Sequence, residues 1–104
     1  MINNPGDTDL FVIDFYFKTC MWCQKFEATW KQLVDYFVDD YGTKIVFLKI
    51  NTRIVPELSK RYNVRSCPTI VSQDPNFSDS YTFKDKRNFE NLQQWIMTKY
   101  DNAN

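Results

Sequence analysis

Residues 10–23 read LFVIDFYFKTCMWC, an almost unbroken apolar run followed closely by a pair of cysteines. The apolar part, residues 10–17, is typical of a strand that is covered on both faces of its sheet. From Met21 the apolar spacing becomes helical, so Cys20 and Cys23 lie where a strand ends and a helix begins. The free N–H groups and positive dipole end of a helix N-terminus favour a thiolate. This stretch therefore predicts a dithiol able to exchange with disulfides.

The helix that begins at Met21 is expected to run to about Asp40. Its apolar residues recur on one face, at the spacing of an amphipathic helix. These residues are Phe26, Trp30, Leu33 and Phe37. Gly42 follows as a plausible left-handed cap, which predicts the end of the helix.

The remaining pattern predicts three more strands and two more helices. The expected segments are a strand at 44–50, a short helix from Pro56 through Tyr62, strands at 69–73 and 80–84, and a helix capped by Asn88. A strand–helix–strand run of this size predicts a parallel pair with a right-handed crossover. A turn at 74–76 predicts antiparallel pairing of the last two strands. The element order is therefore βαβαββα.

Length and composition indicate one domain. The chain has 104 residues, of which 43% are hydrophobic and 17% aromatic, enough to build its own core. We expect an arm at residues 1–9 and a domain at residues 10–104. Thirteen basic residues balance thirteen acidic ones, so no nucleic-acid partner is expected. No apolar run approaches the ~20 residues of a membrane span, so no membrane association is expected.

The cysteine and histidine content limits the expected location of the protein and the kinds of catalysis open to it. Three cysteines are too few for the disulfide scaffold of a small secreted domain, and residues 1–9 lack the apolar core of a signal peptide. A cytoplasmic, reducing location is therefore expected. The chain has no histidine, which excludes Ser-His-Asp catalysis, Cys-His catalysis and His-containing zinc sites within it. The cysteines remain as candidate nucleophiles.

Three motifs together resemble the thioredoxin family over most of the chain. Asp14 stands six residues before Cys20, Lys49-Ile50-Asn51 ends the next strand, and Cys67-Pro68-Thr69 opens a third. The stretch 23–30 is also similar to protein disulfide isomerase domains. The resemblance implies an α/β, thioredoxin-like fold with a minimal four-stranded mixed sheet flanked by helices, in the strand order 2-1-3-4. The first strand and helix of the family are expected to be reduced or missing.

The position of Cys20 at the helix start makes it the expected nucleophile, and Cys23, one turn further in, the expected resolving thiol. Asp14 is unusual because a carboxylate inside an apolar strand is costly unless it is paired or functional. By resemblance, Asp14 takes the proton from Cys23, and Lys49 modulates it. Burial should raise the pKa of Asp14, and Lys49 should oppose that rise. The alternative is a structural ion pair between Asp14 and Lys49.

Four residues are expected to bind substrate: Met21, Trp22, Cys67 and Pro68. By resemblance, Pro68 is cis and lies beside the cysteine pair, where the backbone of Cys67 offers hydrogen bonds to an extended substrate. Trp22 is expected to be exposed between the cysteines as a platform. Cys67 departs from the family pattern. It is a third redox-active thiol, a ligand in a thiolate site, or a small residue tolerated at this position.

The primary hypothesis is a thioredoxin-like protein disulfide oxidoreductase. It would exchange its dithiol with protein disulfides, be recharged by a reductase or another dithiol protein, act as a monomer, and need no organic cofactor and no metal. One alternative is a metal or iron–sulfur module that uses Cys20, Cys23 and Cys67. The other is a non-catalytic interaction protein that keeps the fold.

Overall fold

A four-stranded mixed sheet forms the middle layer of the protein in the computed structural model, which describes residues 7–103. Its strands are β1 (Leu10–Tyr16), β2 (Ile45–Asn51), β3 (Thr69–Gln73) and β4 (Ser80–Thr82). The order across the sheet is β2-β1-β3-β4; β1 is parallel to β2 and antiparallel to β3, and β4 is antiparallel to β3. This is the predicted order, with β1 in the interior of the sheet.

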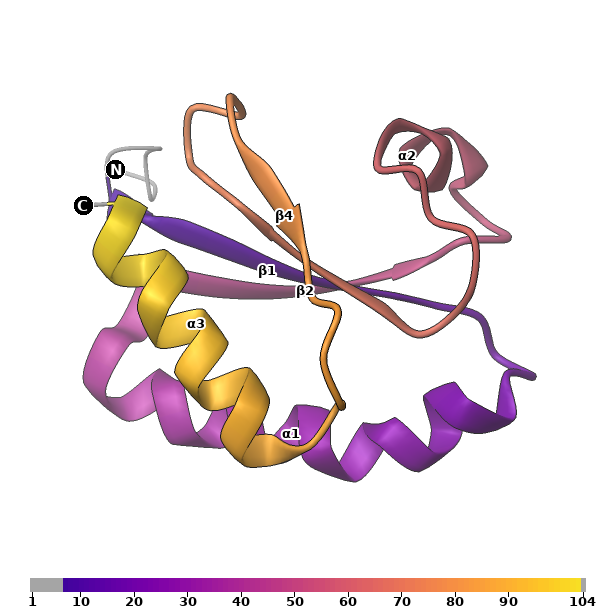
Figure 1. Ribbon diagram of the computed structural model, residues 1–104, viewed down its shortest axis with the longest axis horizontal. Coiled ribbons are helices and arrows are strands. Elements are labelled where there is room, and N and C mark those ends of the chain that lie inside the picture. The colour runs from indigo at the N-terminus through magenta and orange to yellow at the C-terminus, as the bar shows by residue number, and fades with distance from the viewer. Residues whose placement is uncertain (1–6, 104) are drawn as a thin grey trace.

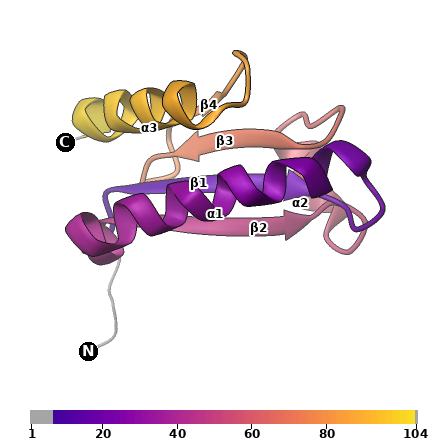
Figure 2. The ribbon, with the colours of Figure 1, turned by 90° about the horizontal axis from the view of Figure 1, so that it is seen from below.

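Helices cover both faces of the sheet unequally. The long helices α1 (Met21–Tyr41) and α3 (Phe89–Ala103) lie across one face, and α2 (Pro56–Arg61) lies on the other, near the end where α1 begins (Figures 1 and 2). A short 3₁₀ turn, η2 (Gly42–Lys44), links α1 to β2. Gly42 follows the last residue of α1 with φ +54° and ψ −126°, a positive-φ conformation that glycine adopts without a Cβ penalty, and its N–H donates to the Val38 carbonyl. The helix thus ends at the predicted glycine, although the backbone there is not the left-handed helical conformation of the expected cap.

Two apolar clusters follow from the alternation of side chains along β1. Leu10 and Val12 point toward the long helices and pack in the larger cluster with Trp30 and Phe37 of α1 and Leu92 of α3. On the opposite face, side chains from β1 and β3 pack with residues of the α2 region. This smaller cluster contains Ile13, Phe15 and Val71 with Leu58, Tyr62 and Val64. Asp14 lies two residues after Val12 in β1, so its side chain lies on the same face of the sheet. That face is the one covered by α1.

The predicted elements are present, with small differences at their ends. The expected strand at 80–84 is shorter, since β4 ends at Thr82, although the N–H of Phe83 still donates to the Ile70 carbonyl at 2.8 Å. Asn88 caps α3 as expected, because its side-chain oxygen accepts the N–H of Asn91 at 2.8 Å. Residues 1–6 of the predicted arm lie outside the described residues. Among residues 7–103, no helix combines the length and the apolar composition needed to cross a bilayer.

Candidate active site

The cysteine pair lies at the junction of β1 and α1. Cys20 is the N-cap of α1 and is disulfide-bonded to Cys23, with 5.2 Å between their Cα atoms. The backbone N–H of Cys23 donates to the Cys20 sulfur at 3.1 Å. Both residues are only 6% exposed. When the bond is reduced, this N–H and the positive end of α1 stabilise negative charge on Cys20.

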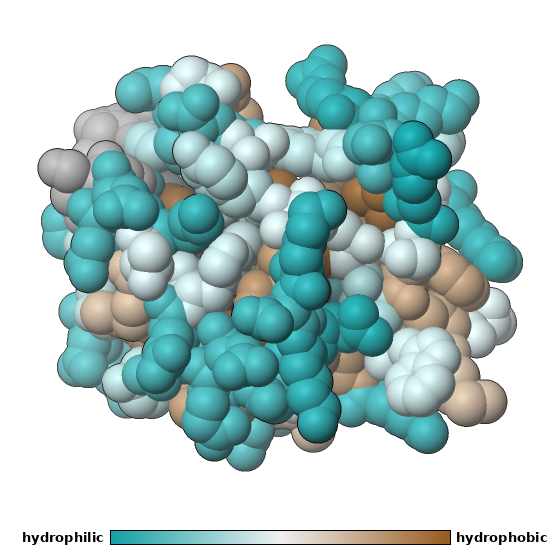
Figure 3. Space-filling view, viewed as in Figure 1, coloured by the Kyte–Doolittle hydropathy of each residue, from teal (hydrophilic) through white to brown (hydrophobic). Residues whose placement is uncertain are grey.

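The two residues between the cysteines form an exposed apolar surface. Met21 is 63% exposed and Trp22 is 61% exposed. The ammonium group of Lys25 lies 4.9 Å from the Trp22 ring centroid, in cation–π geometry. Figure 3 shows brown and white side chains gathered at the end of the molecule where α1 begins. The predicted exposure of Trp22 is therefore confirmed, whereas binding of substrate to it stays a prediction.

The turn before β3 brings Cys67 and Pro68 to the same place. The Cys67–Pro68 peptide bond is cis in the structure. The carbonyl oxygen of Cys67 lies 3.5 Å from the Cys20 sulfur, close enough to accept a weak hydrogen bond from a reduced Cys20 thiol. Cys67 itself is a partly buried free cysteine, and its sulfur lies 3.9 Å from the Thr52 hydroxyl. Burial raises the pKa of the Cys67 thiol, and the hydrogen bond with Thr52 opposes that rise.

Asp14 is a buried carboxyl group in the middle of β1. It is 2% exposed, and its Oδ1 atom has no hydrogen-bond partner among the described residues. Burial raises the pKa of Asp14 from 3.8 to about 7, and Lys49 and Arg87 partly oppose this rise. A carboxyl group with this pKa exchanges protons near neutral pH. The expected direction of the pKa change is therefore confirmed.

Lys49 is held by a residue that the sequence analysis missed. Its ammonium group contacts both carboxylate oxygens of Glu27, at 2.6 and 2.7 Å, and lies 4.5 Å from the Tyr16 ring centroid. Within residues 7–103 no Asp14–Lys49 ion pair is formed, so the structural pair considered as an alternative is not present. Glu27 follows Cys23 by four residues, one turn of α1. This spacing was the available signal, because such residues share a helix face.

Cys23, Glu27 and Lys49 line one open cleft of about 270 Å³. The cleft places the Glu27–Lys49 ion pair beside Cys23. Across the described residues, no group of three or more Cys, Asp, Glu or His side chains is arranged to hold a metal ion.

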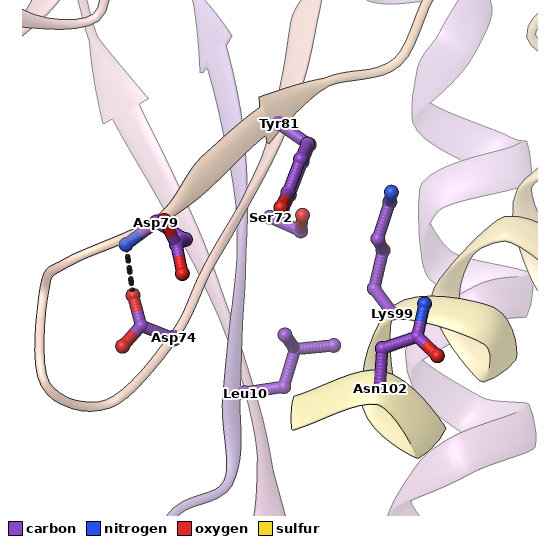
Figure 4. A pocket seen from close by; sticks show the side chains of 7 residues that line it. All are labelled: Leu10, Ser72, Asp74, Asp79, Tyr81, Lys99 and Asn102. Atoms are coloured by element: carbon purple, nitrogen blue, oxygen red, sulfur yellow. Dashed lines mark hydrogen bonds between the residues drawn. The ribbon is translucent and has the colours of Figure 1, made fainter. Parts of the chain in front are cut away.

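A second hollow, of about 150 Å³, lies near the start of β1, between the β3–β4 hairpin and the end of α3 (Figure 4). Two of the charged side chains that line this hollow, Asp74 and Lys99, contact other parts of the protein. The Asp74 carboxylate accepts the backbone N–H of Ser78 and of Asp79 and so closes the hairpin turn. The Lys99 ammonium lies 3.9 Å from the Tyr81 ring centroid and ties α3 to β4. This hollow is therefore explained by how the hairpin packs on α3.

Comparisons with known proteins agree with this geometry. The thioredoxin family model matches residues 2–98. Thioredoxin-1 of Drosophila yakuba is 45% identical over 66 residues, which are 64% of this chain and 58% of that protein. The chain thus spans 58% of the length of the curated relatives it matches, Thioredoxin-1 of Drosophila melanogaster included.

Solved structures are similar over most of the chain. The germline-specific thioredoxin Deadhead of Drosophila melanogaster is 31% identical, with a TM-score of 0.70, over 86% of this chain and 80% of that one. The J-Trx1 fragment of ERdj5 has a TM-score of 0.78 at 18% identity, over 89% of this chain and 44% of that one. At that identity, the likeness to ERdj5 concerns the fold alone.

Proposed function

This chain belongs to the thioredoxin family, and from that premise we propose that it is a thiol–disulfide oxidoreductase acting on protein disulfides. One observation carries the proposal, namely the position of the Cys20 sulfur. It lies at the N-terminus of α1, accepts the N–H of Cys23 at 3.1 Å, and faces the Cys67 carbonyl at 3.5 Å. An attacking thiolate needs stabilisation, and this position provides it.

Cys20 performs the first step as the nucleophile. Its thiolate attacks one sulfur of a substrate disulfide, so a mixed disulfide forms while the substrate's S–S bond breaks. The other substrate sulfur leaves as a thiolate and takes up a proton. The N–H of Cys23 and the dipole of α1 support this step because they lower the energy of the Cys20 thiolate before it attacks.

Cys23 performs the second step as the resolving thiol. It loses its proton and attacks the Cys20 sulfur, so the Cys20–Cys23 bond forms while the bond to substrate breaks. The substrate disulfide has then gained two electrons, and the protein dithiol has lost two. Asp14 accepts the Cys23 proton, a role supported by its burial and by its pKa of about 7. Lys49 modulates Asp14 through its positive charge.

Substrate binds around Cys20 on Met21, Trp22 and the backbone of Cys67 before Pro68. The exposed apolar surface of Met21 and Trp22 supports this proposal, as does the closeness of the Cys67 carbonyl to the reacting sulfur. An extended substrate segment can form strand-like hydrogen bonds with such an exposed backbone.

The oxidised protein requires a source of electrons for another cycle. We infer a reductase or a second dithiol protein as that source, with the Cys20–Cys23 pair itself as the redox group and no organic cofactor. The monomeric state and the cytoplasmic location stay predictions from the sequence.

Reduction of insulin in the presence of dithiothreitol tests the proposal through precipitation of the freed B chain. Wild type should accelerate precipitation, Cys20→Ser should not, and Asp35→Asn, an exposed change on α1, should behave as wild type. Metal analysis of the same samples addresses the alternatives. Folded wild type that is inactive and holds stoichiometric metal would support a cysteine-ligated module. Inactive, metal-free protein would support a non-catalytic interaction protein.

A further inference from the structure

A second cleft opens beside Cys20, on the side of Cys67. It has a volume of about 290 Å³, and its walls include Phe17, Arg53, Arg65 and Cys67. The Cys67 carbonyl lies 3.5 Å from the Cys20 sulfur, so this cleft adjoins the reacting atom. Cys67 thus belongs both to the wall of this cleft and to the surroundings of the Cys20 sulfur.

Two arginines give the cleft its charge. Arg53 lies over the Phe17 ring, with 4.2 Å from its guanidinium carbon to the ring centroid, and its backbone N–H donates to the Asn51 side chain at 2.9 Å. Arg65 is exposed in the segment that leads to Cys67. No aspartate or glutamate lines the cleft, so neither guanidinium meets a carboxylate there. Arginine presents planar, paired donors that match a carboxylate.

Lysines extend this positive charge around the cysteine pair. Lys18 precedes Cys20, and Lys25 lies over the Trp22 ring. Within residues 7–103, ion pairs involve the lysines Lys44 and Lys49, each with one acidic partner. The cations nearest Cys20 are therefore not neutralised by ion pairs within the described part of the chain.

The whole chain has a formal net charge of zero, and part of the compensating negative charge lies far along α1. Asp35, Asp39 and Asp40 occupy the second half of α1. At about 1.5 Å per residue, Asp35 lies roughly 20 Å along the helix from its first residue. The Debye length at physiological ionic strength is about 8 Å, so these carboxylates are largely screened from the cleft. These three aspartates therefore do not neutralise the arginines of the cleft.

We propose that this cleft holds the substrate segment next to the target cysteine and that Arg53 and Arg65 select segments carrying aspartate or glutamate. The inference rests on the proposed oxidoreductase function and names the class of protein disulfide that it serves. Complementary charge around a reactive site mainly accelerates encounter and suppresses wrong partners. The selectivity should therefore appear in the rate of the first attack and should fall with salt.

Peptides with a single cysteine, linked as symmetric disulfide dimers, provide the probe. Three sequences are needed, identical except that the residues flanking cysteine are aspartate, serine or lysine. Each reduction rate by the protein is divided by the rate of the same peptide with dithiothreitol. This division removes differences in the chemistry of the peptide thiol itself.

Wild type should reduce the aspartate peptide about fivefold faster than the lysine peptide at low salt, and the ratio should fall toward one at high salt. The double variant Arg53→Glu/Arg65→Glu should invert the ratio. Arg61→Glu is the matched control, since Arg61 is exposed on α2 and does not line the cleft. It should keep the wild-type ratio. Each ratio compares two peptides on one protein sample, so partial unfolding of a variant does not mimic the effect.

Equal normalised rates for the three peptides would overturn the inference and leave the oxidoreductase function intact. An unchanged ratio in the double variant would also overturn it, because other groups would then cause the preference. Failure of wild type to reduce any of the peptides would overturn the proposed function together with the inference.

Discussion

Lys49 lies directly opposite Asp14 in the pairing of β2 with β1, yet its ammonium group binds Glu27 on α1. The positive charge of Lys49 therefore lowers the pKa of Asp14 without a direct ion pair between the two side chains. Glu27 also acts on Asp14 in its own right, since its negative charge raises the pKa of that group. Glu27 thus acts together with Asp14 and Lys49 in this chain, and its effect on the pKa of Asp14 can be tested.

Glu27→Gln should lower the pKa of Asp14 from its value of about 7, by about one pH unit. The change removes a negative charge and releases Lys49, and both effects favour the ionised carboxylate. The charged groups that act on Asp14 are Glu27 from α1, Lys49 from β2 and Arg87 from the segment before α3. Carbon-13 NMR of the Asp14 carboxyl carbon across a pH series gives the titration midpoint directly.

Asp35→Asn is the control for Glu27→Gln, because it removes one carboxylate from an exposed position two turns further along α1. It should leave the midpoint of Asp14 unchanged. An unchanged midpoint in Glu27→Gln would mean that the Lys49–Glu27 pair acts as a unit with no net influence on the buried carboxyl group. The pair would then be structural.

Asp14→Asn should stabilise the fold above neutral pH and have little effect near pH 4. Asp14 ionises near 3.8 when unfolded but only near 7 when folded, so wild type loses stability as the pH rises through this window. The difference corresponds to a free energy on the order of 4 kcal/mol. Denaturant unfolding of both proteins from pH 4 to pH 8 measures it. A stability difference that stays constant with pH would contradict the assignment.

Asp14→Asn should also slow resolution more than the first attack at neutral pH, because Asp14 accepts the proton of Cys23 in the proposed mechanism. Stopped-flow measurements under single-turnover conditions separate the two steps. Equal slowing of both steps would instead indicate a general disturbance of the site.

The division of labour between the two cysteines gives a further prediction. Cys20→Ser should abolish exchange, whereas Cys23→Ser should still attack disulfides but remain trapped as a mixed disulfide. The reason is that the Cys20 sulfur receives the stabilising N–H and faces the Cys67 carbonyl. Mass spectrometry of trapped adducts identifies the reacting cysteine. Adducts on Cys23 in Cys20→Ser at the wild-type rate would reverse the assignment.

Local patterns in the sequence were sufficient for most strands and helices and for the cysteine junction, whereas the strand order of the sheet followed from the family resemblance. The apolar run before Cys20 specified β1, because a strand buried on both faces needs apolar side chains at nearly every position. The one-face spacing of Phe26, Trp30, Leu33 and Phe37 specified α1, because only a helix places these side chains on one face. The end of β4 could not be predicted in the same way. Strand length there depends on pairing with β3, a contact that no local pattern encodes.

The sequence motif identified Asp14 and Lys49 but not the ion-pair partner of Lys49, which is Glu27. Glu27 is an exposed carboxylate on a helix that has several, and its spacing of four residues from Cys23 does not by itself reveal a contact with Lys49. Its role arises only when α1 packs across β1 and β2 and brings it within 2.6 Å of the ammonium group. The arginine cleft beside Cys67 was likewise not predictable, since Arg53 and Arg65 are brought together by the turns that flank α2.

The last prediction concerns Cys67, which adjoins the active site as a free cysteine while Cys20 is bonded to Cys23. Burial raises the pKa of the Cys67 thiol, so little thiolate forms near neutral pH and alkylation should be slow. Oxidised protein should therefore show a Cys20–Cys23 bridge and a free Cys67 by peptide mapping after non-reducing digestion. Cys67→Ala should keep at least about half of the wild-type exchange rate, because its backbone carbonyl remains. A dominant Cys20–Cys67 peptide would mean that Cys67 competes with Cys23 as the resolving thiol.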